Sequence, residues 1–545
     1  MIRAVTSRWA SAIDSSRVRI RRRRLQAALL AVGWGLCGLC RAGPPQVLVV
    51  AQDLDDIVSL DPAEGFELSS EQAFTNIYQR LLQPDPDQPA LLKPVLASAW
   101  HAGPMPRTLV FELRPDSVFA SGNPVRPEDV IFSLSRAVKL NRAPVFILNE
   151  LGWGADNIDR YLTRLDPHHV QISWPAPVSA AFALNILGAP VASILDQRVV
   201  AAHTIAQDAG NRWLHDHSAG SGPFRIRRYI PHEALVLDAN PRSPADVPLL
   251  QTVVIRSVAD AGTRELLVRV GDADIARDLG PDQLAALRGR PGLQFRQFPS
   301  ASIHYLLFNT ANPAVPALAN PALWEAARWL IDYDGLAHQL LKDQYQVHQS
   351  FLAQGFPGAL DTTPYRLDIP RARAILRAAG LDHGVTIALD VFNQPPFLEI
   401  AQSLQSTFGA AGIRLEIQPA LTGEVYTRVR ARTEQAVWLY WIPDYFDAHS
   451  TAGAFALNRE DGTQTLAWRA GWHIPQLSAL TLAALAEPDA QRRVALYQQI
   501  QAEVQRASPF VIALQERRAL VMRANVRGYR QGLNADMAYY DRVSK

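Results

Sequence analysis

The stretch best suited to chemistry is Ala436–Ser450, which reads A-V-W-L-Y-W-I-P-D-Y-F-D-A-H-S. It places two carboxylates, Asp444 and Asp447, among aromatic residues that include Trp441 and Tyr445. A carboxylate can accept a charge-assisted hydrogen bond from an ammonium group, and neighbouring rings can exclude water and add cation–π attraction. The stretch therefore predicts the floor of a site for a small cationic or zwitterionic ligand. A core strand that ends in a polar turn is the alternative.

The residues before these carboxylates predict the element that positions them. Val437–Trp441 is a short apolar and aromatic run typical of a strand, and Pro443 ends it. Helix and strand patterns mix along the rest of the chain, so the sequence predicts an α/β or α+β fold. Other predicted strands are 46–52, 108–113, 169–174, 225–229, 253–257, 303–308, 385–391, 414–417 and 510–514, and predicted helices are 69–82, 127–138, 322–330, 368–380, 397–411, 423–430 and 488–505.

Length and charge narrow the class of protein. A chain of 545 residues is too long for one compact core and predicts two or three domains. Its 48% hydrophobic and 19% charged residues are typical of a soluble globular protein. Residues 1–42 hold nine arginines and one acid, Asp14, so the remainder carries a net charge of −6 rather than the +2 of the whole chain. This mildly acidic body argues against nucleic acid as a partner.

The N-terminus has the features of a cleavable secretory signal peptide. Arg21–Arg24 form a positive region, Leu25–Leu39 is a mostly apolar run of 15 residues, and residues 40–42 offer a tolerable cleavage site. The run is too short for a comfortable membrane span, although a stable N-terminal anchor is the alternative. Residues 1–42 are therefore expected to be removed on export to the periplasm.

Two details of this leader bear on the exported protein. The two cysteines, Cys37 and Cys40, lie inside the apolar run, so cleavage after Ala42 leaves no thiol and no disulfide. Stability must then come from burial of the core. Translation could begin at Met1 or at Val18, and Val18 would give a leader of ordinary size.

Several segments resemble, in order, those of the family 5 extracellular solute-binding proteins, the dipeptide- and oligopeptide-binding components of bacterial ABC importers. The matching segments are TLVFELRPDSVFASGNPVRPEDVIFSLSRAV, SAGSGPFRIRRY, YLLFNTANP, YRLDIPRARAILRAAGL and YWIPDYFDAHS. Their shared order makes the resemblance specific, and it covers nearly all of the chain after the leader. The sequence departs from the family at 120–122, where His-Asp-Gly is common, and at Phe446 and Ala448, which replace two customary prolines.

The resemblance implies a fold and a division into domains. The fold would be a two-lobed periplasmic-binding-protein fold of type II, with an extra inserted domain and a hinge between the lobes. Domain I would comprise residues 46–77, 218–298 and 509–545, domain II residues 78–217, and domain III residues 299–508. The ligand would lie between the lobes.

The resemblance also implies ligand-binding residues. The aspartate of the family's W-x-x-D motif grips the free amino group of a bound peptide, and Asp444 occupies that place. Trp441 and Tyr445 would line the first side-chain pocket. The loop that enters the first helix would border the ligand through Glu67, Leu68 and Ser69. Asp447 and His449 are weaker candidates.

The leading hypothesis is a monomeric periplasmic protein that captures short peptides and delivers them to an inner-membrane ABC permease. A nickel or nickel-chelate carrier is the alternative within the family, with His449 as an imidazole ligand. A secreted hydrolase is the alternative from another class, but the sequence has no G-x-S-x-G, H-E-x-x-H, P-loop or dinucleotide motif. We therefore expect neither an enzyme nor a bound cofactor or metal.

Overall fold

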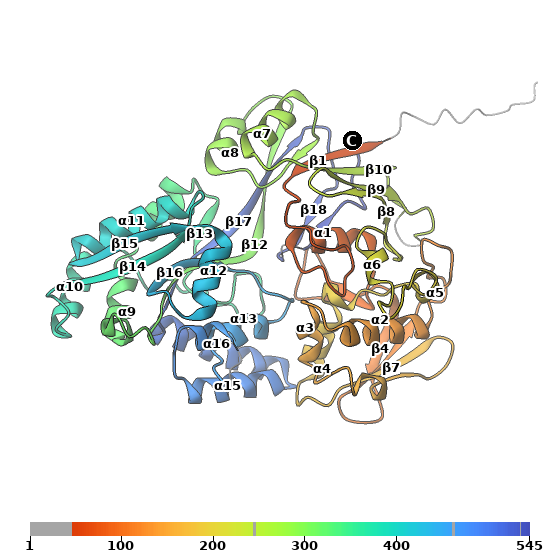
Figure 1. Cartoon of the computed structure of the whole chain (residues 1–545), viewed down its shortest axis with the longest axis horizontal. Coiled ribbons are helices and arrows are strands. Elements are labelled where there is room, and N and C mark those ends of the chain that lie inside the picture. The colour runs from red at the N-terminus through yellow and green to blue at the C-terminus, as the bar shows by residue number, and fades with distance from the viewer. Residues whose placement is uncertain (1–45, 244–246, 460–463, 535) are drawn as a thin grey trace, which may run out of the picture. The chain divides into compact units, whose positions relative to one another are not determined.

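The largest feature of the computed structural model is a mixed sheet of eleven strands, among the described residues 46–243, 247–459, 464–534 and 536–545. Figure 1 shows its arrangement. In spatial order its strands are β15 (Ile413–Ala420), β14 (Val385–Phe392), β16 (Ala436–Trp441), β12 (Leu293–Phe308), β17 (Phe510–Arg523), β11 (Ile275–Ala276), β1 (Val47–Gln52), β10 (Thr252–Ser257), β9 (Ala234–Ala239) and β8 (Phe224–Ile230), and β13 (Tyr345–Val347) pairs with β17.

Strands β12 and β17 join the two halves of this sheet as a long antiparallel ribbon (Figure 1). One half of β12, from Leu293 to Pro299, pairs with the C-terminal half of β17, and the other half, from Ile303 to Leu307, pairs with its N-terminal half. The register shifts between Pro299 and Ile303. The sequence predicted only the apolar halves of both strands, because the outer half of β12 carries exposed or half-buried Gln and Arg that interrupt the apolar pattern.

A second, four-stranded sheet lies in the segment that follows the first helix. Its strand order is β4 (Ala97–Ala102), β5 (Thr108–Leu113), β7 (His169–Ser173) and β6 (Leu162–Arg164). Its core includes Phe111 and Phe182, and it also receives Tyr445 and Leu485 from far along the chain. The short strands β2 (Leu82–Pro84) and β3 (Leu92–Pro94) pair nearby, and the helices of this segment are α2 (Pro127–Leu140), α3 (Val145–Asn149), α4 (Ala180–Leu187), α5 (Gln197–Ala202) and α6 (Asn211–Leu214).

The remaining helices pack around the large sheet and the ribbon (Figure 1). They are α1 (Leu68–Ile77), α7 (Ala261–Val270), α8 (Pro281–Leu287), α9 (Pro321–Arg328), α10 (Ile369–Ala378), α11 (Phe397–Ala410), α12 (Thr422–Ala431), α13 (Ala448–Phe455), α14 (Leu466–Arg469), α15 (Pro475–Ala486), α16 (Ala490–Ala507) and a π-helix, Gly335–Leu340. The C-terminal strands β18 (Arg530–Gln531) and β19 (Ala538–Tyr539) pair with each other. None of the helices in the described part of the chain is both long and apolar enough to cross a membrane.

The first helix differs from its prediction at both ends. Helix α1 begins after Glu67 rather than at Ser69, and it ends at Ile77, well before Leu82. The backbone of Tyr78 is extended, and the next residue, Gln79, forms an antiparallel β-bridge with Ile194. The serine cap and the apolar periodicity of the sequence could not predict where the helix ends, because the residue after Tyr78 pairs with a residue that is distant in the sequence.

The glycine-rich turn before β8 fits against the end of α1. A Cβ added to Gly220 would lie 2.2 Å from the carbonyl oxygen of Ile77, and one added to Gly222 would lie 2.5 Å from the carbonyl carbon. The Gly222 N–H donates to the same Ile77 oxygen at 3.0 Å. The two glycines are therefore needed for close backbone approach.

The predicted leader, residues 1–42, lies outside the described residues, and the predicted domain boundaries remain a prediction.

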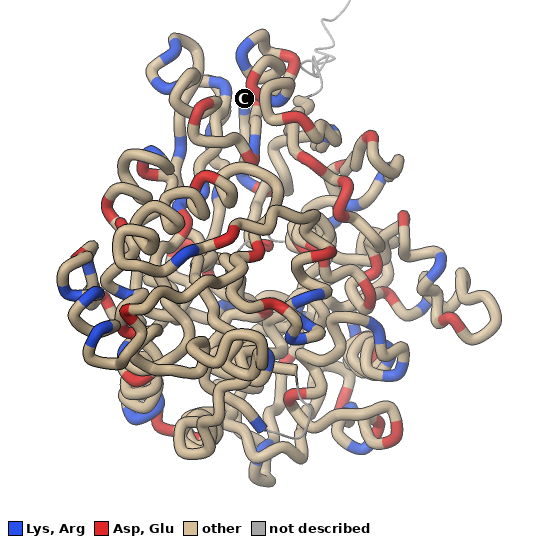
Figure 2. The backbone as a smooth tube through the Cα atoms, turned by 60° about the vertical axis from the view of Figure 1, so that its left-hand side comes forward, with Lys and Arg blue, Asp and Glu red and all other residues tan. Residues whose placement is uncertain are grey.

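Acidic and basic residues are interspersed along the backbone, without a large face of one sign in the view of Figure 2.

Candidate functional site

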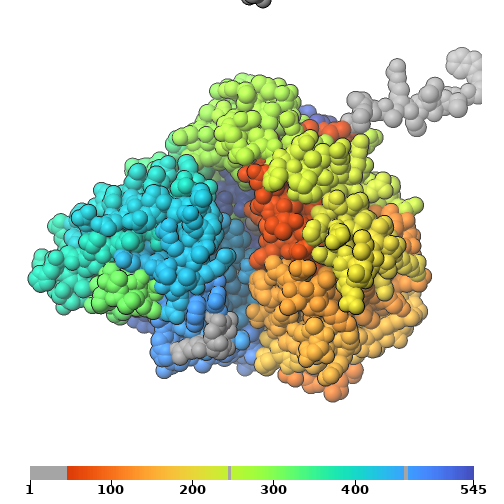
Figure 3. Space-filling model, viewed as in Figure 1, coloured from red at the N-terminus to blue at the C-terminus, as the bar shows by residue number. Residues whose placement is uncertain are grey.

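A cavity of about 1220 Å³ lies between segments that are far apart in the chain. Figure 3 shows a hollow between the residues drawn in blue and those drawn in red and orange. One part of its lining comes from residues 56–71 and 146–150, a second from residues 426–469, and a third from Asn534 and Asp536. We call it the main cavity. Its volume is slightly above the range of about 300–1,000 Å³ for sites that take drug-sized ligands.

Asp444 lies in the wall of the main cavity, directly after β16. Its backbone N–H donates to the Ser450 hydroxyl at 2.8 Å, which fixes the turn. Its half-buried carboxylate makes no hydrogen bond or ion pair with any described residue. Burial, with the charge of Glu150, raises its pKa to about 7. The site therefore leaves a carboxylate in need of a positive partner.

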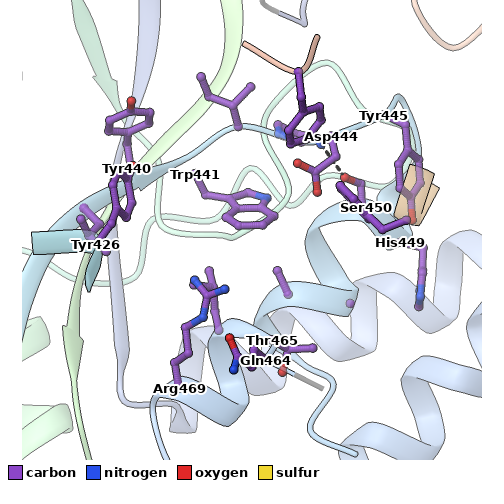
Figure 4. A pocket seen from close by; sticks show the side chains of 18 of the residues that line it. Tyr426, Tyr440, Trp441, Asp444, Tyr445, His449, Ser450, Gln464, Thr465 and Arg469 are labelled. Carbon is purple, nitrogen blue, oxygen red and sulfur yellow. Dashed lines mark hydrogen bonds between the residues drawn. The ribbon is translucent and has the colours of Figure 1, made fainter. Parts of the chain in front are cut away.

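The aromatic residues of the same stretch divide between the cavity and the protein core. Trp441 lines the main cavity, and its indole lies between Asp444 and Arg469 in Figure 4. The indole N–H is buried and has no hydrogen-bond partner among the described residues. Tyr445 also lines the cavity, but its ring is buried against Phe182, with ring centroids 5.8 Å apart and planes at 80°.

Of the three residues predicted in the loop that enters the first helix, two line the main cavity, and the structure places Leu68 and Ser69 inside α1. Glu67 and Leu68 line the cavity. The Glu67 carboxylate accepts hydrogen bonds from the Phe66 N–H at 3.1 Å and from the Ser70 hydroxyl at 3.4 Å. Ser69 does not line the cavity, because its hydroxyl donates to a backbone oxygen, that of Asp53, at 3.3 Å.

Asp447 does not line the main cavity, and its carboxylate instead holds neighbouring helices together. It caps α13 by accepting the His449 N–H at 2.7 Å, and it accepts the Arg493 guanidinium at 2.6 Å and the Asn185 amide at 2.7 Å. Burial alone would raise the pKa of Asp447, but the charge of Arg493 and these hydrogen bonds hold it below its usual value. The carboxylate is thus fully partnered without a ligand.

His449 lines the main cavity but belongs to no cluster of metal-ligating side chains among the described residues. It is buried against Phe182, and burial lowers its pKa to about 4, so the imidazole is neutral. Its Nδ1 is 3.3 Å from the Tyr497 hydroxyl. Among the described residues, no group of three or more His, Cys, Asp or Glu could hold a metal ion. The nickel alternative therefore finds no ligand set in this part of the chain.

Sequence patterns missed two kinds of charged residue in the main cavity. The first is Arg469, at the end of α14, whose guanidinium points toward the Trp441 side of the cavity (Figure 4). Its Nε is buried without a partner, it makes no ion pair with a described residue, and burial lowers its pKa. The second is a set of acids on the other segments, Glu71, Glu150 and Asp536. No motif marks any of these residues.

Among the described residues, the cavity thus combines carboxylates that have no cationic partner with a guanidinium that has no anionic partner. Asp444 and Arg469 both come from the segment that follows β16, and both line the one cavity. A ligand that carries an ammonium group and a carboxylate would satisfy both charges at once. The charges that line the cavity therefore suit a zwitterion.

The chain is similar to known proteins along most of its length. The model of the bacterial extracellular solute-binding proteins, family 5, matches residues 92–463. The probable D,D-dipeptide-binding periplasmic protein DdpA of Escherichia coli is 27% identical over 496 residues, which cover 90% of this chain and 93% of that protein. Di/tripeptide-binding protein 2 of Pseudomonas aeruginosa is 25% identical, with 81% of this chain and 84% of that protein covered.

A solved structure extends the similarity to the fold. The periplasmic binding protein DppA of Helicobacter pylori, in complex with the peptide STSA, superposes with a TM-score of 0.75 at 20% sequence identity. The match covers 91% of this chain and 97% of that one. These similarities confirm the family resemblance and the predicted α/β fold of two lobes, type II.

Proposed function

Since the chain belongs to the bacterial extracellular solute-binding proteins of family 5, we propose that it captures short peptides in the main cavity and delivers them to an inner-membrane ABC permease. The names of its relatives support peptides as the ligand class, because they include a D,D-dipeptide-binding and a di/tripeptide-binding protein. The periplasm is the compartment we infer, from the predicted leader and from the relatives described as periplasmic. We propose that the protein works as a monomer.

The observation that carries the proposal is the pair of unpartnered charges, Asp444 and Arg469, on one cavity. In our proposal the peptide's α-ammonium binds Asp444 and its terminal carboxylate binds Arg469. An ammonium enclosed in a dry site without a counter-charge would be very costly, so Asp444 sets the polarity of the bound peptide. Trp441, with its unpartnered N–H, would contact the peptide between its two ends.

Closure would bring the two sides of the main cavity together around the peptide. The ribbon of β12 and β17 is the natural hinge, since it joins the halves of the large sheet and shifts register between Pro299 and Ile303. Peptide main chain could then pair with exposed backbone groups of the wall. Ordered water in the side-chain pockets would give tolerance of sequence.

The family and the relatives are binding proteins of transporters, and we infer that this chain catalyses no reaction. Turnover of peptide or glycan substrates by the purified protein would support the secreted-hydrolase alternative instead. Native mass spectrometry of protein purified without denaturation would show retained peptide masses if the proposal holds. A metal adduct in their place would favour the nickel alternative.

The decisive experiment is a calorimetric titration of Asp444→Asn with a free-amine dipeptide and its N-acetylated form. Asparagine keeps the shape and removes the charge, so the free-amine dipeptide should lose about 2–5 kcal/mol of affinity. The N-acetylated dipeptide should bind the wild type poorly. Asp116→Asn is the control, because Asp116 is exposed and does not line the main cavity. Equal affinity of the free-amine dipeptide for wild type and Asp444→Asn would refute the anchor role.

A further inference from the structure

A second group of acids lies beside Asp444 in the main cavity. Glu71 belongs to the first turn of α1, and Asp536 belongs to the C-terminal segment between β18 and β19. The Thr75 hydroxyl, one helical turn after Glu71, donates to the backbone oxygen of Asp536 at 2.9 Å. The Asn76 amide donates to the backbone oxygen of Ala538 at 2.7 Å. These bonds hold Asp536 against the face of α1 that carries Glu71.

The same C-terminal segment touches the turn that carries Asp444. The Asn534 amide contacts the backbone oxygen of Pro443 at 3.4 Å. Asn534, Asp536, Glu71 and Asp444 therefore all line the main cavity, with Asn534 against the turn of Asp444 and Asp536 held beside the helix that carries Glu71. Charges interact across this group, since Asp536 and Asp444 both raise the pKa of Glu71, after burial itself.

The described residues supply no cationic partner for these acids. Apart from the backbone N–H of Asp536 itself, no described residue forms a hydrogen bond or ion pair with the carboxylate of Glu71 or Asp536, although Asp536 is only 7% exposed. The nearest cations are engaged elsewhere: Arg80 donates to the Gly188 oxygen at 2.6 Å, and Arg518 lies 3.5 Å from Glu516. The charges of both arginines lower the pKa of Asp536, but neither arginine forms an ion pair with its carboxylate.

The side chain of Asn534 provides an independent observation, a hydrogen-bond acceptor without a donor among the described residues. The side-chain oxygen of Asn534 is buried, lines the main cavity and has no hydrogen-bond partner among the described residues. Asn534 is 6% exposed, so solvent does not readily satisfy this acceptor. A buried acceptor without a donor is costly, and a ligand N–H would remove that cost.

We propose that Glu71, Asp536 and the Asn534 oxygen form a second cation subsite beside Asp444, which takes the positively charged side chain of a peptide's first residue. This inference rests on the proposed function, because Asp444 is taken to hold the α-ammonium. The two cationic groups of such a first residue, its α-ammonium and its side chain, match Asp444 and the pair of acids Glu71 and Asp536. The protein would then prefer peptides that begin with lysine or arginine over peptides with an apolar first residue.

The test compares lysyl-alanine with norleucyl-alanine by calorimetric titration near pH 7. Norleucine has the same chain without the terminal ammonium, so the pair isolates the second charge. The wild type should bind lysyl-alanine about 10- to 100-fold more tightly, the range for a hydrogen-bonded charge. The double variant Glu71→Gln, Asp536→Asn should lose this preference and still bind norleucyl-alanine. Glu112→Gln is the control, because Glu112 is exposed on β5 and does not line the main cavity.

The outcomes separate this subsite from the proposed function. Norleucyl-alanine that binds as tightly as lysyl-alanine to the wild type overturns the subsite and leaves peptide binding intact. Retention of the preference in the double variant also overturns it. Failure of both dipeptides to bind overturns the proposed function and the subsite with it. The wild-type comparison decides the question even if the double variant does not fold.

Discussion

The Asn185 amide of α4 donates a 2.7 Å hydrogen bond to the Asp447 carboxylate, across 262 residues of sequence. The ring of Phe182, from the same helix, packs against Tyr445 and His449, with ring centroids 5.8 Å and 5.7 Å apart. The contact thus joins the segment predicted as domain II to the segment predicted as domain III. It places the turn with Asp444 between the two, where a ligand would meet both.

This contact predicts unequal effects of its two partners on stability. Asp447→Ala leaves the Arg493 guanidinium, whose side chain is 13% exposed, without its counter-charge, and should lower the free energy of unfolding by about 3–5 kcal/mol. Asn185→Ala removes one neutral donor and should cost only about 1 kcal/mol, because Arg493 still satisfies Asp447. Urea denaturation of the ligand-free protein measures both. A loss for Asn185→Ala as large as that for Asp447→Ala would contradict the assignment.

A separate prediction concerns export. The arginine cluster and the 15-residue apolar run should direct the chain out of the cytoplasm. Mature protein should appear in the periplasmic fraction with an N-terminus near Gly43, as measured by fractionation and terminal sequencing. An intact leader in a membrane-bound product would favour the stable anchor instead.

The sequence predicted the elements around the site better than the site itself. Val437–Trp441 became β16, because a central strand buried on both faces is a run of apolar residues without alternation. The W-x-x-D resemblance placed Asp444 at the end of that strand, and the structure puts it on the main cavity. Its binding role is still a prediction.

The sequence could not predict which charged side chains from distant segments meet at the main cavity. Glu71 and Asp536 meet because Thr75 bonds the backbone of Asp536, a contact across 461 residues. Arg469 stands in a four-residue helix with no periodic pattern to mark it. Ser69 has the residue type of a helix cap, yet its hydroxyl bonds to Asp53, because the chain folds back on α1 there. Local patterns carry no information about such contacts.

The raised pKa of Asp444 predicts a pH-dependent stability of the ligand-free protein. The folded-state pKa is about 7 against an ordinary value of 3.8, so the folded protein binds this proton more tightly than the unfolded chain does. The charge therefore costs no stability below about pH 4, and the cost grows as the pH rises to about 7. Asp444→Asn should raise the free energy of unfolding at pH 8 by on the order of 1 kcal/mol or more, and by much less at pH 4.5. Chemical denaturation at both pH values checks this, and an equal gain at the two would exclude burial of charge as the cause.

The last prediction concerns Arg469 as the partner of a ligand carboxylate. Its guanidinium faces the main cavity with a buried Nε that has no partner among the described residues, and burial lowers its pKa, so an anion in the cavity should stabilise its charge. Arg469→Gln should weaken binding of a dipeptide with a free carboxylate about 10- to 100-fold. The same dipeptide with a C-terminal amide should bind the wild type weakly and should lose little more in the variant. Calorimetric titration of both ligands measures the coupling, with Arg414→Gln as the control, since Arg414 is an exposed residue of β15 that pairs with Glu416 and does not line the main cavity. If Arg469→Gln weakens the amide and the free acid equally, Arg469 shapes the cavity without recognising the carboxylate.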